Sequence, residues 1–123
     1  MTAAVVLVVV LVALAAFQLA LALGAPLGRF AWGGQHRVLP TGLRVGSAAA
    51  IAIYAFIGVL ALDRAGAVDA FPGRFSTVGM WVVVAYFVLG VGLNAISRSA
   101  PERLVMVPVT IALAALSTVV ALG

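Results

Sequence analysis

The sequence predicts an all-α protein, a bundle of four transmembrane helices arranged as two helical hairpins. Hydrophobic residues make up 66% of the 123 residues and charged residues only 8%, whereas soluble domains are about 45–50% apolar and about 25% charged. Four runs without any charge cover most of the chain, and each is close to the roughly 20 residues that a helix needs to cross a bilayer. We therefore expect one integral membrane domain over residues 1–123.

The four predicted spans are residues 3–23, 45–62, 78–96 and 104–122. Strands are excluded because the runs are too long and polar and apolar residues do not alternate in them. The first run has no positively charged start and exceeds the roughly 7–15 apolar residues of a signal peptide, so we expect a retained helix. Gly24 and Pro26 are typical of a helix end. Ser99 and Glu102 match a capping box, in which both side chains bind free backbone N–H groups at a helix start.

The arginines predict the orientation of the spans. Residues 24–44 and 97–103 lie on one side of the membrane and carry five arginines, whereas the connection between the second and third spans carries only Arg64 and Arg74. Cytoplasmic connections are enriched in Lys and Arg. We therefore expect a multi-pass protein of the plasma (inner) membrane, with loops 24–44 and 97–103 in the cytoplasm and both termini outside.

Several function classes are excluded by composition. The arginines lie between apolar runs and form no patch, which argues against nucleic acid as a partner. The chain has no cysteine and one histidine, so we expect no metal site, no cofactor and no dithiol chemistry. Proton-coupled exporters of the small four-helix type need an acid within a span, but every acid here lies in a loop or at a helix start. No nucleophile–base pair is visible, and we expect a non-enzymatic protein.

Four polar residues inside the spans are candidate binding residues. Under the expected topology, Gln18, Ser47, Asn94 and Thr110 all fall in the cytoplasmic half of the bundle. Polar groups in hydrocarbon are costly unless they face a partner or a cavity, so these side chains should converge inward. One interpretation is a small polar vestibule. The other is hydrogen bonding between helices, worth about 0.6 kcal/mol per contact.

The first loop supplies the remaining candidates. It is 21 residues long and contains Trp32, His36 and Arg37 in its most distinctive stretch. Loops of this length are often functional, so these three residues are candidates for the mouth of the vestibule. The alternative is an interfacial loop in which an aromatic anchor and arginines contact lipid headgroups.

Two stretches of the chain are distinctive: Ala31-Trp32-Gly33-Gly34-x-His36-x-x-Leu39-Pro40-x-x-Leu43-Arg44-x-x-Ser47 and Asn94-x-x-Ser97-Arg98-Ser99-x-x-Glu102-Arg103. On these stretches, the chain resembles uncharacterised small four-helix integral membrane proteins of bacteria, of the type common in actinobacterial and other GC-rich genomes. The resemblance covers most of the chain and implies a bacterial source. It carries no substrate and no catalytic residue.

Three functions follow from these observations. The first is a non-enzymatic binding or transport module for a small or amphiphilic molecule, acting as a homo-oligomer in the lipid bilayer. The second is a structural or accessory subunit of a larger membrane complex, docked through faces of small residues. The third is an interfacial lipid-acting enzyme that uses His36 with Arg37. A polar-lined cavity would favour the first function, and a sealed bundle the second.

Overall fold

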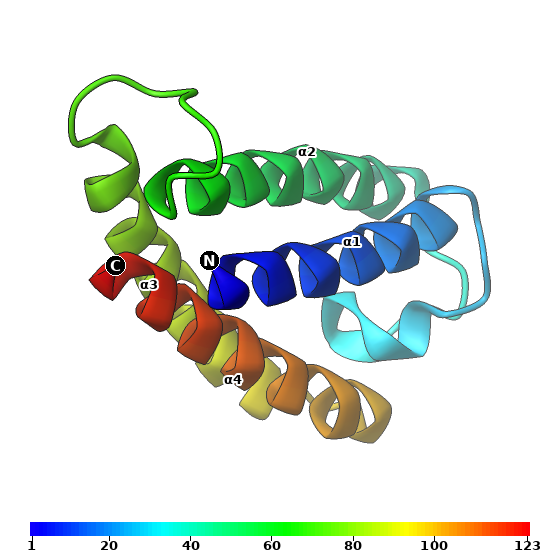
Figure 1. Cartoon of the computed structure of the whole chain (residues 1–123). Coiled ribbons are helices and arrows are strands. Elements are labelled where there is room, and N and C mark those ends of the chain that lie inside the picture. The colour runs from blue at the N-terminus through cyan, green and yellow to red at the C-terminus, as the bar shows by residue number, and fades with distance from the viewer.

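A computed structural model describes all residues, 1–123, and contains four long helices and no strand. The helices are α1 (Thr2–Ala22), α2 (Thr41–Arg64), α3 (Phe75–Ala95) and α4 (Ala100–Leu122). Each is long and apolar enough to cross a membrane. The predicted all-α fold, a four-helix bundle built from two hairpins, is confirmed (Figure 1).

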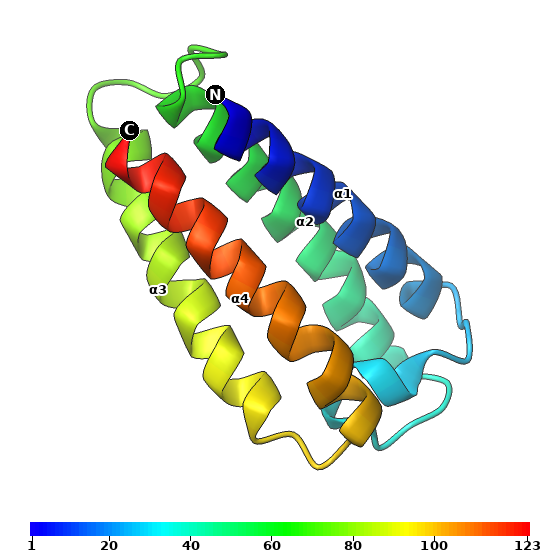
Figure 2. The same cartoon turned by 60° about the horizontal axis from the view of Figure 1, so that its bottom comes forward.

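The helices run up and down, so that alternate connections share an end. Helix α1 packs along α2 and α3 packs along α4, while α1 against α4 and α2 against α3 join the two hairpins. Both termini and the connection between α2 and α3 lie at one end (Figure 2). The connection between α1 and α2 and the short turn between α3 and α4 lie at the other, which we call the loop end.

Helix α2 is longer at both ends than its predicted charge-free span, because its ends carry charged residues. Arg44 lies in the first turn, and its Nε donates to the carbonyl oxygen of Ala22 at the end of α1 (2.8 Å). Arg64 is the last residue of α2, and its Nη2 donates to the carbonyl oxygen of Ala121 in α4 (3.1 Å). Both arginines thus satisfy carbonyl groups that a helix leaves free at its C-terminus.

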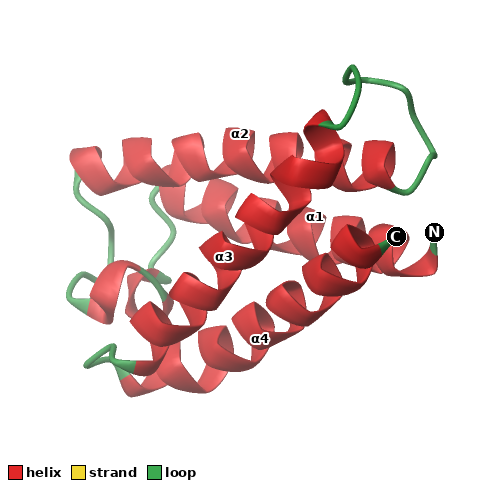
Figure 3. Cartoon of the chain, turned by 90° about the vertical axis from the view of Figure 1, so that its left-hand side faces the viewer, coloured by secondary structure: helices red, strands yellow, loops and turns green.

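The two halves of the bundle differ in packing. The buried apolar core lies mainly in the half near the termini, where Leu7, Ile57, Leu60, Met80 and Val120 pack together. Toward the loop end the α3–α4 hairpin diverges from α2 (Figure 3). The space between them at the loop end is occupied by two single-turn 3₁₀ helices, η1 (Gly28–Phe30) and η2 (Trp32–Gly34).

Candidate functional site

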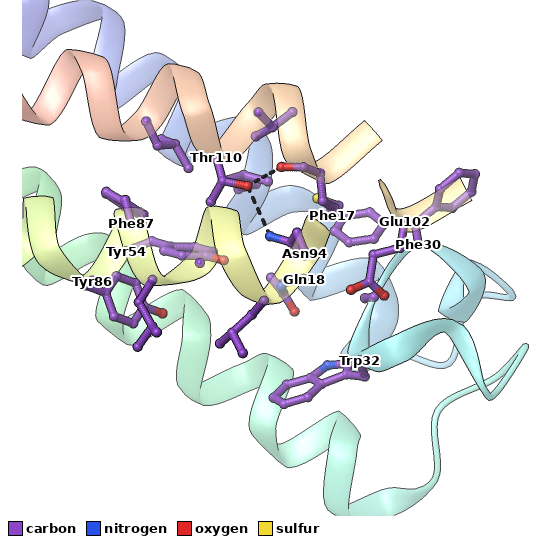
Figure 4. A pocket seen from close by; sticks show the side chains of 18 residues that line it. Phe17, Gln18, Phe30, Trp32, Tyr54, Tyr86, Phe87, Asn94, Glu102 and Thr110 are labelled. Atoms are coloured by element: carbon purple, nitrogen blue, oxygen red, sulfur yellow. Dashed lines mark hydrogen bonds between the residues drawn. The ribbon is translucent and has the colours of Figure 1, made fainter. Parts of the chain in front are cut away.

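A cavity of about 330 Å³ lies in the loop-end half of the bundle, and all four helices and the 30–32 stretch line it (Figure 4). Of the predicted candidates, four line this cavity: Gln18, Trp32, Asn94 and Thr110. Most of the other lining side chains are apolar. The structure therefore brings together predicted polar residues from α1, α3, α4 and the first loop around one hollow.

Asn94 and Thr110 connect α3 to α4 inside the cavity. The Asn94 Nδ2 group donates to Thr110 Oγ1 (3.1 Å), and the Thr110 hydroxyl donates to the carbonyl oxygen of Met106 in its own helix. The hydroxyl has only one proton, so Thr110 has no donor left for a ligand. Asn94 keeps its carbonyl oxygen as an acceptor. Both interpretations of this pair hold at once, because it bridges two helices and lines the cavity.

Gln18 supplies a second acceptor from α1. Its Oε1 atom is buried and has no hydrogen-bond partner in the protein. Buried polar side-chain atoms are nearly always partnered, and each exception calls for an explanation. Because Gln18 lines the cavity, a donor group on a bound molecule would supply the missing partner.

Trp32 is held in place by α2. Its indole Nε1 donates to Ser47 Oγ (3.1 Å), and Ser47 is fully buried. The indole ring lies against Gly46, where an added Cβ would stand 3.0 Å from two ring carbons. Ser47 therefore does not line the cavity, and its role in this structure is to position the tryptophan.

The backbone of Trp32 is unusual. Trp32 is the only non-glycine residue with a positive φ, at 53°. This conformation is uncommon for a bulky side chain and persists where the surroundings hold it in place. The contacts of Trp32 with α2 therefore hold the indole in the cavity wall against a backbone preference.

Glu102 is the one charged residue of the lining, and sequence analysis did not identify it as a site residue. Its side chain is only 6% exposed, and its Oε2 accepts from the backbone N–H of Gly33 (2.9 Å). The serine half of the predicted capping box is present, because Ser99 Oγ accepts from the Glu102 backbone N–H (3.4 Å). The carboxylate, however, reaches to the loop and not back to Ser99.

The spacing of Glu102 from other residues of α4 predicts which face of the helix it lies on. Residues 102, 106, 110 and 113 all line the cavity and are separated by three or four positions, which places them on one face of α4. As part of a capping box, Glu102 was expected to bind the backbone at its own helix start and not to face a cavity. An acid at a helix start is thus close enough to the hollow to line it.

Loop contacts fix the stretch from residue 28 to 34, which we call the plug because it fills the loop end of the bundle. Besides the bonds of Trp32 and Gly33, the Ser99 hydroxyl donates to the carbonyl oxygen of Arg29 (2.6 Å). The backbone N–H of Gly28 donates to the carbonyl oxygen of Arg37 (2.9 Å), which ties the plug to the returning chain. The plug is therefore attached to both hairpins.

His36 and Arg37 do not lie where the sequence analysis expected them. Neither lines the cavity, and both are exposed. Their carbonyl oxygens pack on Gly28, so the loop uses their backbone to hold the plug. Of the three residues expected at the mouth, only Trp32 lines the cavity, and Glu102 lines it as well.

The lining of the cavity combines a charged group, neutral polar groups and aromatic rings. One carboxylate, two carboxamides and several aromatic rings line it, and none of these forms a nucleophile–base pair. No group of three or more histidine or acidic side chains could hold a metal ion. Hydrogen bonds, charge and ring faces are the interactions that the lining offers.

Comparison with protein-family models, with curated proteins and with solved structures finds no match for this chain.

Proposed function

We propose that the protein is a non-enzymatic membrane module that binds a small amphiphilic molecule in the loop-end cavity. The observation that carries this proposal is where charge lies in a mostly apolar cavity. Its one charged side chain, Glu102, lies toward the loop end with Gln18 and Asn94, whereas Phe87 lies deeper, beside the phenol rings of Tyr54 and Tyr86. A molecule with one charged or polar end and one largely apolar end matches this arrangement.

Access from the lipid also supports an amphiphilic ligand. The lining includes Leu89 and Leu93 of α3, which are 63% and 58% exposed. An amphiphile concentrated in the bilayer can therefore approach the cavity from the side. The arginine distribution would place this opening in the cytoplasmic half of the plasma membrane.

The packed half of the bundle favours ligand binding over transport of a ligand across the membrane in this conformation. The apolar core around Leu7, Leu60 and Met80 closes the centre of the bundle in the half near the termini, and the hollow that Leu60 lines there lies between α2 and α3, apart from the loop-end cavity. Packed interiors leave few voids larger than a water molecule. Transport would require this half to rearrange, whereas binding and release at the loop end would not.

The test uses the two tryptophans of the chain, which lie in different surroundings. Trp32 lines the cavity, whereas Trp81 lies near the other end of α3 and does not line it. The two side chains are about equally exposed, at 44% and 45%, so contact with the cavity is what distinguishes them. The probe is 2-(4-bromophenyl)ethanol, an amphiphile whose bromine quenches tryptophan fluorescence on contact. Trp81→Phe protein reports Trp32 alone, and Trp32→Phe protein reports Trp81 alone as the matched control. Both are reconstituted in nanodiscs of zwitterionic lipid.

We expect saturable quenching of Trp32, because the probe fills a limited site. Quenching of Trp81 should rise in proportion to the probe dissolved in the lipid and should not saturate. Quenching of Trp32 that follows the same proportional course as that of Trp81 would overturn the proposal. That result would leave the accessory-subunit function as the better explanation of the bundle.

A further inference from the structure

We infer that the cavity selects an organic cation, an amphiphilic ammonium compound whose charge pairs with Glu102. This inference rests on the proposed function and names the chemical class of its ligand. Three features of the lining carry it: a buried carboxylate without a cation, a buried carboxamide oxygen without a donor, and a set of aromatic rings.

The carboxylate is the first feature. Glu102 is 6% exposed and receives one hydrogen bond to its side chain, from the Gly33 backbone N–H. An ionised carboxylate has about four lone-pair sites, and a buried charge is costly unless it is paired. No arginine lines the cavity. The lining therefore offers a negative charge that a bound cation would compensate.

Nearby arginines are engaged elsewhere. The Arg44 guanidinium donates to the end of α1, and that of Arg103 donates to the carbonyl oxygen of Ser97. The Arg29 guanidinium lies over the Phe30 ring, 4.8 Å from its centroid. Three of the five arginines at the loop end thus bind carbonyl groups or stack on a ring, and the other two, Arg37 and Arg98, are exposed and do not line the cavity. The carboxylate in the cavity is left for a ligand.

The neutral polar groups point to a ligand that donates hydrogen bonds. Gln18 Oε1 is buried without a partner. The Thr110 hydroxyl donates its proton to the carbonyl oxygen of Met106 in its own helix, and the Trp32 indole N–H donates to Ser47 Oγ. An ammonium group carries several N–H donors, so one group could bind the Glu102 carboxylate and still donate to a neutral acceptor such as Gln18 Oε1.

The rings of the lining suit a cation as well. Phe17, Phe30, Trp32, Tyr54 and Tyr86 surround the cavity from three elements of the first hairpin and from α3 (Figure 4). Cations are attracted to the faces of aromatic rings, and more strongly where water is excluded. The same rings accept the apolar part of an amphiphile.

The dimensions limit the size of the cation. Along α4 the lining runs from Glu102 to Leu113, about 16 Å at a rise of about 1.5 Å per residue. A volume of about 330 Å³ is at the small end of ligand sites, which span roughly 300–1,000 Å³. A compact arylalkyl or short alkyl amine fits, with its charge at Glu102 and its apolar part toward Leu113.

The test compares two probes with one skeleton in Trp81→Phe protein: 2-(4-bromophenyl)ethylammonium and 2-(4-bromophenyl)ethanol. Trp32→Phe protein measures how each probe partitions into the zwitterionic lipid, and the apparent affinities at Trp32 are corrected for it. We expect the ammonium probe to bind at least about tenfold more tightly, as a charge-assisted contact in a poorly solvated site should provide.

Glu102→Gln, added to Trp81→Phe, should abolish this preference, so that the two probes bind with the same partition-corrected affinity. Glutamine keeps an oxygen for the Gly33 N–H, and an unchanged Trp32 emission without probe will show that the plug is in place. The matched control is Asp69→Asn, which removes the same charge from an exposed residue in the loop between α2 and α3. This control should keep the preference.

The outcomes separate the two proposals. Saturable binding of the alcohol with no preference for the ammonium probe would overturn the inference and leave the proposed function standing. A preference that survives Glu102→Gln would also overturn it, because the charge would then not be recognised by Glu102. Absence of saturable quenching by either probe would overturn the proposed function itself.

Discussion

Replacing Gly28 by alanine should release the plug without unfolding the helices. A Cβ on Gly28 would lie 1.8 Å from the carbonyl oxygen of His36 and 2.9 Å from that of Arg37. Real Cβ atoms essentially never approach within 3.0 Å of another heavy atom. Both neighbours are backbone atoms, so no side-chain rotation relieves the overlap, and the two stretches of the loop have to move apart by about 1.2 Å or more.

The cost follows from the bonds that this movement breaks. The Gly28–Arg37 and Trp32–Ser47 hydrogen bonds each contribute about 1 kcal/mol, and the bond to the carboxylate of Glu102 contributes about 1.5–3 kcal/mol. Loss of the first two alone weakens the docked position by about 2 kcal/mol, which is about a thirtyfold change in its population. If the hydrogen bond between Gly33 and Glu102 is lost as well, most molecules have the plug undocked.

The assay is Trp32 fluorescence in the Trp81→Phe background. Gly28→Ala should shift the emission of Trp32 to longer wavelength and increase its quenching by acrylamide, because the indole then no longer packs against Gly46. Far-UV circular dichroism should not change, since Gly28 lies outside the four long helices. Gly42→Ala is the matched control, because nothing lies within 4 Å of a Cβ there. Emission and quenching of Gly28→Ala protein equal to those of its parent would refute the reasoning.

Three further predictions concern the bundle. Asn94→Leu keeps the volume but removes the hydrogen bond to α4, so reversible unfolding in detergent should show a loss of about 0.6 kcal/mol; a loss above about 3 kcal/mol would contradict a single bridging contact. Arg44→Ala should lower the free energy of unfolding by about 1.5–3 kcal/mol in the same assay, because the end of α1 loses its hydrogen bond from the guanidinium. The control Arg37→Ala removes the same charge from an exposed side chain and should lower it by less than about 0.5 kcal/mol. In intact cells, an impermeant thiol reagent should label Asp69→Cys and not Gln35→Cys, and the reverse pattern would refute the orientation deduced from the arginines.

The helices were predictable because their signal is strong and local. Long charge-free runs leave few alternatives to membrane-spanning helices, and the structure has such a helix for each predicted run. The exact ends were less predictable. Helix α2 extends through Arg44 and up to Arg64, because arginine side chains find partners at helix ends and do not stop the helix.

The site was predictable only in part, because side-chain direction in a loop depends on contacts made far away in the sequence. Gln18, Asn94 and Thr110 lie on helices whose faces follow from spacing, and they line one cavity. His36 and Glu102 depend on how the plug folds. Pairing of Gly28 with the returning chain leaves His36 exposed, and Gly33 draws the Glu102 carboxylate toward the loop.

The bonds between the plug and α4 bear on how the protein is assembled during synthesis. The two bonds from the plug to α4 join residues 69 and 70 positions apart in the chain, and chains emerge from the ribosome N-terminal part first. When the first hairpin has inserted, the plug has Ser47 as a partner but neither Ser99 nor Glu102. The cavity is therefore closed only when the last helix has entered the membrane. A chain that stops after three helices leaves the polar side of the hollow exposed to lipid and to proteases, and the binding that we propose requires all four helices.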